Sequence, residues 1–256
     1  MTDYRRYAIY YTPEPNGDLS RLGTHWLGWD ADVGAPAQHL SIEDLGEDLA
    51  ALTERPRRYG FHGTLKAPFR LHPDRSPLDL HHSVQRIAAC SAPIVLPGLA
   101  ISDRSGFLSL RPVGDTADLN DLSDRLVSEL DAFRAPATET EAAKWKNRRL
   151  TDRQRAAVAD WGYPFVFEDF CFHMTLTGPR PAKRLAQLQR ILTPILEPNL
   201  PRPFEMNSVS LCGEAPNGFF RVIHRYGMAE VEDTLASVPR TESGEQITAA
   251  PKLPLG

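Results

Sequence analysis

The sequence is poor in cysteine and has no long apolar run. Its 256 residues include three cysteines, Cys90, Cys171 and Cys212, an odd number without the close spacing of a metal or redox motif. A disulfide framework is therefore not indicated, and a reduced compartment fits best. No apolar run approaches the ~20 residues that cross a bilayer, and the N-terminal residues lack the apolar stretch of a signal peptide. We expect a cytoplasmic protein with no membrane partner.

An excess of positive charge is also missing. The chain has 29 Lys and Arg against 33 Asp and Glu, a formal net charge of −4. Sequence-independent binding of long nucleic acids depends on a basic surface. This composition argues against such binding, whereas RNA ends and small phosphorylated substrates remain open as partners. The length predicts one large domain or two tightly joined lobes, and the composition predicts no oligomeric state.

The sequence does contain two copies of one short motif. Residues 61–65 read Phe-His-Gly-Thr-Leu, and residues 172–176 read Phe-His-Met-Thr-Leu. Successive side chains of an extended strand point to opposite faces. Each copy thus predicts a strand whose histidine and threonine share one face, while the flanking Phe and Leu face a core. Two such strands, far apart in the sequence, predict two halves that meet around a shared site.

Periodicity and turn signals predict an α+β protein in which the order motif strand, helix, strand, turn, strand occurs twice. This repeat indicates an internal duplication. We expect an N-terminal lobe at 1–134, a C-terminal lobe at 135–228 and a flexible tail at 229–256. The expected strands are 7–11, 58–71, 94–101, 106–113, 165–177, 204–212 and 218–228, and the expected helices begin near residues 41, 76, 119, 151 and 181.

The residue types of the two motifs suit acid–base chemistry on a phosphodiester. Histidine has an ordinary pKa of ~6.5, so it can give or take a proton near neutrality. A neutral imidazole can remove a proton from water while a charged one donates to the leaving oxygen, each contributing ~10²–10⁴-fold. The threonine hydroxyls can donate to non-bridging phosphate oxygens. The sequence predicts His62 and His173 as catalytic and Thr64 and Thr175 as substrate-binding, with no metal and no cofactor.

The duplicated His-x-Thr motif resembles the two-histidine (2H) phosphoesterase superfamily, which includes RNA ligase-like 2′-5′ enzymes and cyclic nucleotide phosphodiesterases. Residues 57–69, with 7–11, 26–28 and 172–178, look closer to a bacterial branch encoded with phosphonate-degradation genes. The resemblance covers residues 4–228 and implies a bilobed fold with two pseudo-symmetric antiparallel β-sheets, flanking helices and a central groove. It also implies metal-independent hydrolysis of a small cyclic phosphate, which in the phosphonate branch would derive from ribose.

Strand parity adds three further candidates for contacts with the substrate. Arg58 and Lys66 share the face of His62 if the first motif strand is unbroken, and Lys66 would supply positive charge to phosphate. On the opening strand, Ile9 is expected to face the core, which would turn Tyr10 toward the groove.

Alternative interpretations use the same residues. The site would also suit an RNA end, a 2′,3′-cyclic nucleotide, or a phosphate- or nucleotide-binding module without catalysis. Cys171, two residues before His173, suggests a thiol hydrolase as an alternative. Residues i and i+2 of a strand, however, point in parallel rather than toward each other. A zinc site would need His62, His173 and a distant ligand such as His224.

Residues 144–155 are rich in basic side chains around Trp145. The preferred interpretation is a solvated junction between the two halves, and a site for the terminal phosphate of a small substrate is the second. The basic residues are Lys144, Lys146, Arg148, Arg149, Arg153 and Arg155.

Overall fold

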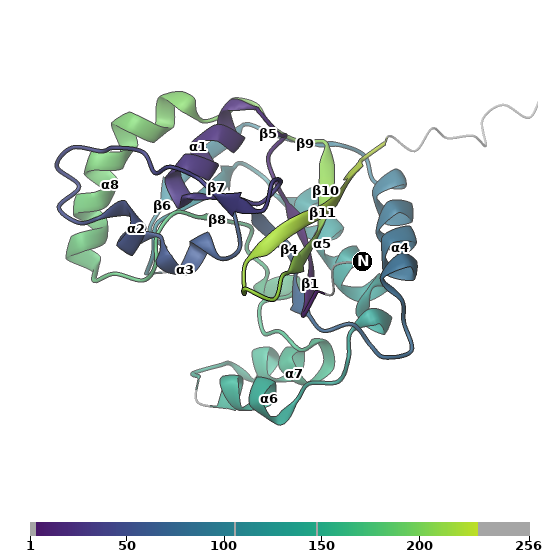
Figure 1. The fold of residues 1–256 in the computed structure, drawn as a ribbon. Coiled ribbons are helices and arrows are strands. Elements are labelled where there is room, and N and C mark those ends of the chain that lie inside the picture. The colour runs from purple at the N-terminus through teal and green to yellow at the C-terminus, as the bar shows by residue number, and fades with distance from the viewer. Residues whose placement is uncertain (1–3, 105, 147, 230–256) are drawn as a thin grey trace, which may run out of the picture.

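The computed structural model describes residues 4–229 apart from residues 105 and 147, and it has the predicted α+β class. Within these residues seven strands form one sheet in the order β11-β10-β1-β4-β8-β7-β6, with every neighbouring pair antiparallel (Figure 1). The strands are β1 (Tyr7–Tyr11), β4 (Gly63–Phe69), β6 (Gly98–Ser102), β7 (Ser109–Val113), β8 (Met174–Thr175), β10 (Ser208–Glu214) and β11 (Phe220–Gly227). Small two-stranded sheets pair β2 (Trp29–Asp30) with β3 (Ala35–Pro36) and β5 (Ile94–Leu96) with β9 (Phe204–Met206). The expected tail falls almost wholly outside the described residues.

Amphipathic helices pack against the sheet, as the leucine spacing predicts. Helix α4 packs on β10 and β11, α5 on β4, and α8 on β6. Two further helices, α6 and α7, lie together at one end of the molecule, beyond the sheet (Figure 1). No helix of the described residues is long and apolar enough to cross a membrane. The helices are α1 (Asp18–Leu27), α2 (Leu49–Leu52), α3 (Glu54–Arg57), α4 (Pro77–Ala89), α5 (Ala117–Glu129), α6 (Glu139–Lys146), α7 (Asp152–Trp161) and α8 (Ala182–Leu196).

The sheet does not follow the predicted division of the chain at residue 134. The C-terminal hairpin β10–β11 extends the side of the sheet that holds β1 and β4, whereas β7 pairs with β8 and β6 pairs with β7. Each side therefore combines strands from both predicted lobes. The two expected sheets are also joined into one, because β4 pairs with β8.

The two faces of the central strands have different surroundings. On β1, Tyr7, Ile9 and Tyr11 belong to the main hydrophobic core, while Ala8 and Tyr10 pack with residues of β10 and β11 on the other face. On the first motif strand, Phe61, Leu65 and Phe69 belong to the main core. The alternation that the sequence predicts for both strands is therefore confirmed, and it leaves one face of the sheet for polar side chains.

Three expected elements are shorter because the backbone turns within them. Strand β4 begins at Gly63 rather than at 58, since α3 and a left-handed Gly60, with φ of 72°, precede it. Helix α2 begins at Leu49 rather than near 41, since Asp44 and Gly46 have φ values of 58° and 72°. Strand β8 is confined to Met174–Thr175, since a 3-10 turn at Phe167–Asp169 replaces the start of the expected strand.

Capping boxes are present at two helix starts. Ser76 and Asp79 exchange side-chain and backbone hydrogen bonds at the start of α4, with Pro77 just inside the helix. Thr151 and Gln154 do the same at the start of α7. The second box stabilises the start of α7, which borders the site described next.

Candidate active site

The two motif strands lie side by side and antiparallel. Strand β4 pairs with β8 at Gly63 and Met174. Continued by one residue on each side, this register sets His62 opposite Thr175 and Thr64 opposite His173. The four side chains share one face, and the two histidines are diagonal neighbours, an arrangement that separates side-chain origins by ~7–8 Å. The predicted convergence of the two motifs is therefore present in the sheet itself.

Close packing between the motifs fixes this arrangement. A Cβ atom added to Gly63 would lie 2.2 Å from the ring of Phe172, the aromatic residue of the other motif. The first motif repeats this pattern, since a Cβ on Gly23 of α1 would lie 2.0 Å from the ring of Phe61. Both phenylalanines thus occupy space that glycine leaves open.

His62 is held in one orientation by local contacts. Its Nδ1–H donates to the carbonyl oxygen of Gly60 at 2.9 Å, which leaves Nε2 to accept from the Thr64 hydroxyl at 3.1 Å. The ring also lies against that of Tyr10, with centroids 3.9 Å apart. Burial lowers the pKa of His62 to about 4, an effect that His173 increases and the hydrogen bond to Gly60 opposes. His62 is therefore neutral at pH 7, and its Nε2, which accepts from Thr64, is unprotonated.

His173 is oriented in the same way. Its Nδ1–H donates to the carbonyl oxygen of Cys171 at 2.8 Å, two residues earlier, as in the first motif. Burial lowers the pKa of His173, the hydrogen bond to Cys171 opposes this, and the positive charge of Arg111 adds to it. The pattern of one ring nitrogen bound to a backbone carbonyl and the other directed elsewhere is thus common to both histidines.

A cavity of about 500 Å³ opens over the polar face of the sheet. His62, Thr64, Thr175 and Tyr10 line it. A second cavity of about 230 Å³ shares His62 and Thr175 and continues to Phe107. The ring of His173 lines neither cavity and packs 5.4 Å from that of Phe107. The two cavities thus meet at the His62–Thr175 pair and pass beside His173.

Of the three candidates from strand parity, Tyr10 lies where expected and two do not. Tyr10 is 1% exposed and lies against His62 at the cavity. Lys66 faces the other side, because an irregularity in β4 pairs it with Ile9 although Thr64 pairs with Tyr10. Arg58 is exposed, precedes the strand and lines neither cavity.

Lys66 has a structural environment of its own. Its side chain is 4% exposed, donates to the carbonyl oxygen of Val127 at 3.0 Å and lies 3.7 Å from a carboxylate oxygen of Asp131. Burial lowers its pKa to about 8, and Asp131 opposes this. The prediction that Lys66 supplies charge to phosphate is therefore wrong.

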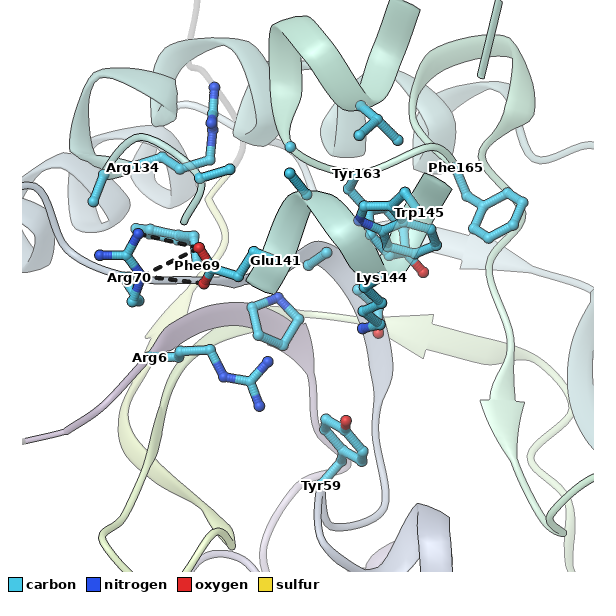
Figure 2. A pocket seen from close by; sticks show the side chains of 18 of the residues that line it. Arg6, Tyr59, Phe69, Arg70, Arg134, Glu141, Lys144, Trp145, Tyr163 and Phe165 are labelled. Carbon is cyan, nitrogen blue, oxygen red and sulfur yellow. Dashed lines mark hydrogen bonds and ion pairs between the residues drawn. The ribbon is translucent and has the colours of Figure 1, made fainter. Parts of the chain in front are cut away.

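The opposite wall of the cavity comes from the segment that the sequence presented as a solvated junction. Lys144 and Trp145 of α6, Arg148 after it, and Tyr163 and Phe165 after α7 line the cavity (Figure 2). The basic cluster at residues 144–155 is the feature of the sequence that indicates this wall. Only part of the cluster contributes, since Arg153 and Arg155 form ion pairs with Asp169 and Asp152.

The residues of the zinc and thiol alternatives have other contacts. The ring of His224 packs against those of His81 and Tyr226. No group of three or more His, Cys, Asp or Glu residues in the described ranges is arranged to hold a metal ion. The thiol of Cys171 accepts a hydrogen bond from Arg111 at 2.6 Å, and its contact with His173 is made by the backbone carbonyl.

Comparison with known proteins identifies a family and two long relatives. The family model described as protein of unknown function (DUF1045) matches residues 64–221. A protein named ribose 1,5-bisphosphate phosphokinase PhnN from Janthinobacterium sp. (strain Marseille) is 38% identical over 173 residues, which are 67% of this chain and 38% of that protein. A protein of the same name from Laribacter hongkongensis (strain HLHK9) is 35% identical over 176 residues, 68% of this chain and 40% of that protein. The chain thus spans about two fifths of the length of these curated relatives.

Solved structures align along most of the chain at low identity. The protein TT0787 of Thermus thermophilus is 15% identical, with 89% of this chain and 100% of that chain covered and a TM-score of 0.41. LigT of E. coli in its apo form is 12% identical, with coverages of 90% and 100% and a TM-score of 0.41.

Proposed function

This chain belongs to the DUF1045 family, and we propose that it is a phosphodiesterase that hydrolyses a small cyclic phosphate between His62 and His173. One observation carries the proposal: two His-x-Thr segments meet on adjacent antiparallel strands, with their four polar side chains on one face, and three of these side chains line a cavity. This is the arrangement that the resemblance to 2H phosphoesterases implies.

The pKa shifts of the two histidines support one division of the proton-transfer roles. His62 is the base, because its pKa of about 4 keeps Nε2 unprotonated at neutral pH. His173 then acts as the acid. Burial lowers its pKa, but the negative charge of a bound phosphodiester raises the pKa of a nearby imidazole. Substrate binding thus favours uptake of a proton from solvent by His173, which His173 then donates as the acid.

The reaction step balances without a further reactant. Water attacks phosphorus as its proton passes to Nε2 of His62. The bond from phosphorus to the leaving oxygen breaks as that oxygen receives the proton of His173. When substrate binds, the Thr64 hydroxyl turns from Nε2 of His62 to a non-bridging oxygen, which frees Nε2 for the proton of water. The Thr175 hydroxyl donates to the other non-bridging oxygen, and charge develops on both. Exchange of protons with solvent restores the starting states.

A phosphorylated sugar is the substrate class that the comparisons favour. Both curated relatives carry a name that refers to a ribose bisphosphate. The name also refers to a kinase, but a P-loop requires a Gly-Lys pair and this sequence contains none. A ribose-derived cyclic phosphate, as in the phosphonate branch of the resemblance, combines the sugar with the chemistry of the site.

Hydrolysis assays on matched variants test the proposal. We expect the wild type to hydrolyse ribose cyclic phosphates in excess EDTA, and His62→Ala and His173→Ala to lower turnover by roughly 10²–10⁴-fold. His82→Ala, which removes an exposed histidine far from the cavity, is the control and should retain full activity. Full activity in both motif variants would refute the proposal.

The same assay separates the alternatives. A preference for 2′,3′-cyclic nucleotides or RNA ends would identify those molecules as the substrates instead. Tight binding of cyclic phosphates without turnover would indicate a binding module. Activity that EDTA removes and zinc restores would indicate metal-assisted hydrolysis instead.

A further inference from the structure

The wall of the cavity opposite the motif strands carries polar side chains that the proposed proton transfers do not use. Lys144 and Arg148 come from α6 and the residues after it, and Tyr163 follows α7. Arg6 and Tyr59 approach the same space from the side of the sheet (Figure 2). We refer to these five residues as the cap cluster.

Two of the cations that line the cavity form no ion pair among the residues that the structure describes. Arg6 pairs with Glu214 at 2.6 Å, Arg70 with Glu141 at 3.1 Å, and Arg134 with Asp131 at 2.8 Å. No ion pair is formed by Lys144 or Arg148 within the part of the chain that the structure describes. The cavity therefore has unneutralised positive charge at one position, over α6.

The cations of the cap cluster are close enough to repel one another. Burial lowers the pKa of Lys144, and the charges of Arg6 and Arg148 lower it further. Phenol groups surround the same space: burial raises the pKa of Tyr163, Tyr59 adds to this, and Arg148 opposes it. A bound anion would relieve the repulsion and accept hydrogen bonds from both kinds of donor.

The contacts of Trp145 favour a phosphate group over a nucleobase as the group that binds at the cap cluster. The Lys144 ammonium lies 5.0 Å and the Arg148 guanidinium 5.3 Å from the centre of the indole ring. Tyr163 meets the same ring edge to face at 5.7 Å. A base that stacked on Trp145 would have to displace these groups, whereas a phosphate binds them where they are.

We propose that the cap cluster is a second anion site, which binds a terminal phosphate of the substrate while its cyclic phosphodiester lies between the motif strands. The position of the scissile phosphate rests on the proposed function. The inference narrows the substrate to small molecules with two phosphate groups, which a cavity of about 500 Å³ accommodates.

Two probes that differ by one phosphate test this site. The probes are methyl riboside 2,3-cyclic phosphate with and without a 5-phosphate, assayed on the wild type and on the double variant Lys144→Gln/Arg148→Gln. The wild type should have a KM roughly 10- to 100-fold lower for the 5-phosphorylated probe. The double variant should lose this difference. Lys146→Gln, an exposed residue of the same helix outside the cavity, should retain it.

Equal KM values for the two probes in the wild type, or an unchanged difference in the double variant, would overturn the anion site. Calorimetric binding of the 5-phosphorylated probe distinguishes this result from failure of the proposed function. Binding that depends on Lys144 and Arg148 without any hydrolysis would support the anion site and refute the phosphodiesterase. Hydrolysis that is indifferent to both residues would do the opposite, and absence of both binding and hydrolysis would refute both.

Discussion

At the scale of single residues, Gly63 shows how each motif depends on the other. Its missing side chain is the space that the ring of Phe172 occupies. We expect Gly63→Ala to lower the free energy of unfolding by about 1–3 kcal/mol, because the ring or the strand must move. Denaturant unfolding measures this change. Gly227→Ala, also in a strand but with open space beside it, is the control. Equal denaturation midpoints for the two variants would contradict the packing argument.

The two lowered histidine pKa values predict an acidic pH optimum for the free enzyme. His62 must be neutral to accept a proton, so kcat/KM should rise through a pKa of about 4. His173 must be charged to donate one, so kcat/KM should fall as the pH rises through the pKa of His173, which lies below the ordinary 6.5. Because bound phosphate raises the pKa of His173, the falling limb of kcat should lie at higher pH than that of kcat/KM. Coincident falling limbs would count against His173 as the acid.

Residue types alone were sufficient to predict that the four motif side chains share one face and that Tyr10 lies on the same side, because period-two alternation holds wherever a strand is regular. They were insufficient for Lys66. The irregularity that turns Lys66 inward depends on how β4 pairs with β1, and no local sequence pattern marks it.

At the scale of elements, the irregularity in β4 makes Lys66 a buried cation rather than a substrate contact. We expect Lys66→Met to leave kcat/KM unchanged and to preserve or raise stability, since an apolar side chain avoids the cost of burying charge. Steady-state assays and denaturant midpoints measure these effects. A large rise in KM would restore Lys66 to the substrate site.

The lowered pKa of Lys66 also sets the sign of a pH effect. The folded protein releases the Lys66 proton near pH 8, whereas the unfolded chain keeps it to about 10.5. Wild-type stability should therefore rise between these values, and any advantage of Lys66→Met should shrink as pH increases.

The helices α6 and α7 show the limit of prediction for whole elements. The capping box at Thr151 and the charge run were visible in the sequence, and α7 forms where expected. The position of both helices over the cavity was not predictable, because neither buries an apolar face that would identify its partner. Their attachment depends instead on distant contacts such as that between Arg70 and Glu141.

At the scale of the whole molecule, the interleaved sheet predicts that the chain folds as one unit. Separation between residues 134 and 135 removes β8 from β7 and the β10–β11 hairpin from β1. We expect fragments 1–134 and 135–256 to lack cooperative unfolding when alone and to regain structure and activity when mixed, since each completes the other's sheet. Circular dichroism and the hydrolysis assay measure this. Cooperative unfolding of either fragment alone would contradict it.

The duplication was visible in the sequence, but the exchange of hairpins between its halves was not. Both halves present the same order of elements, and that order is compatible with two separate sheets or with an interleaved one. The choice depends on pairing between strands that are far apart in the chain, β1 with β10 above all.

The hydrogen bonds of the two imidazoles have a consequence for protein engineering. In both motifs Nδ1–H is bound by the peptide carbonyl two residues earlier, at 2.9 and 2.8 Å, so a stretch of about five residues aims its own ring. The first ring also packs against Tyr10 of β1, so a partner at that position belongs to the same unit. Grafting the pair onto neighbouring antiparallel strands of an unrelated scaffold would also require the contact between Gly63 and Phe172.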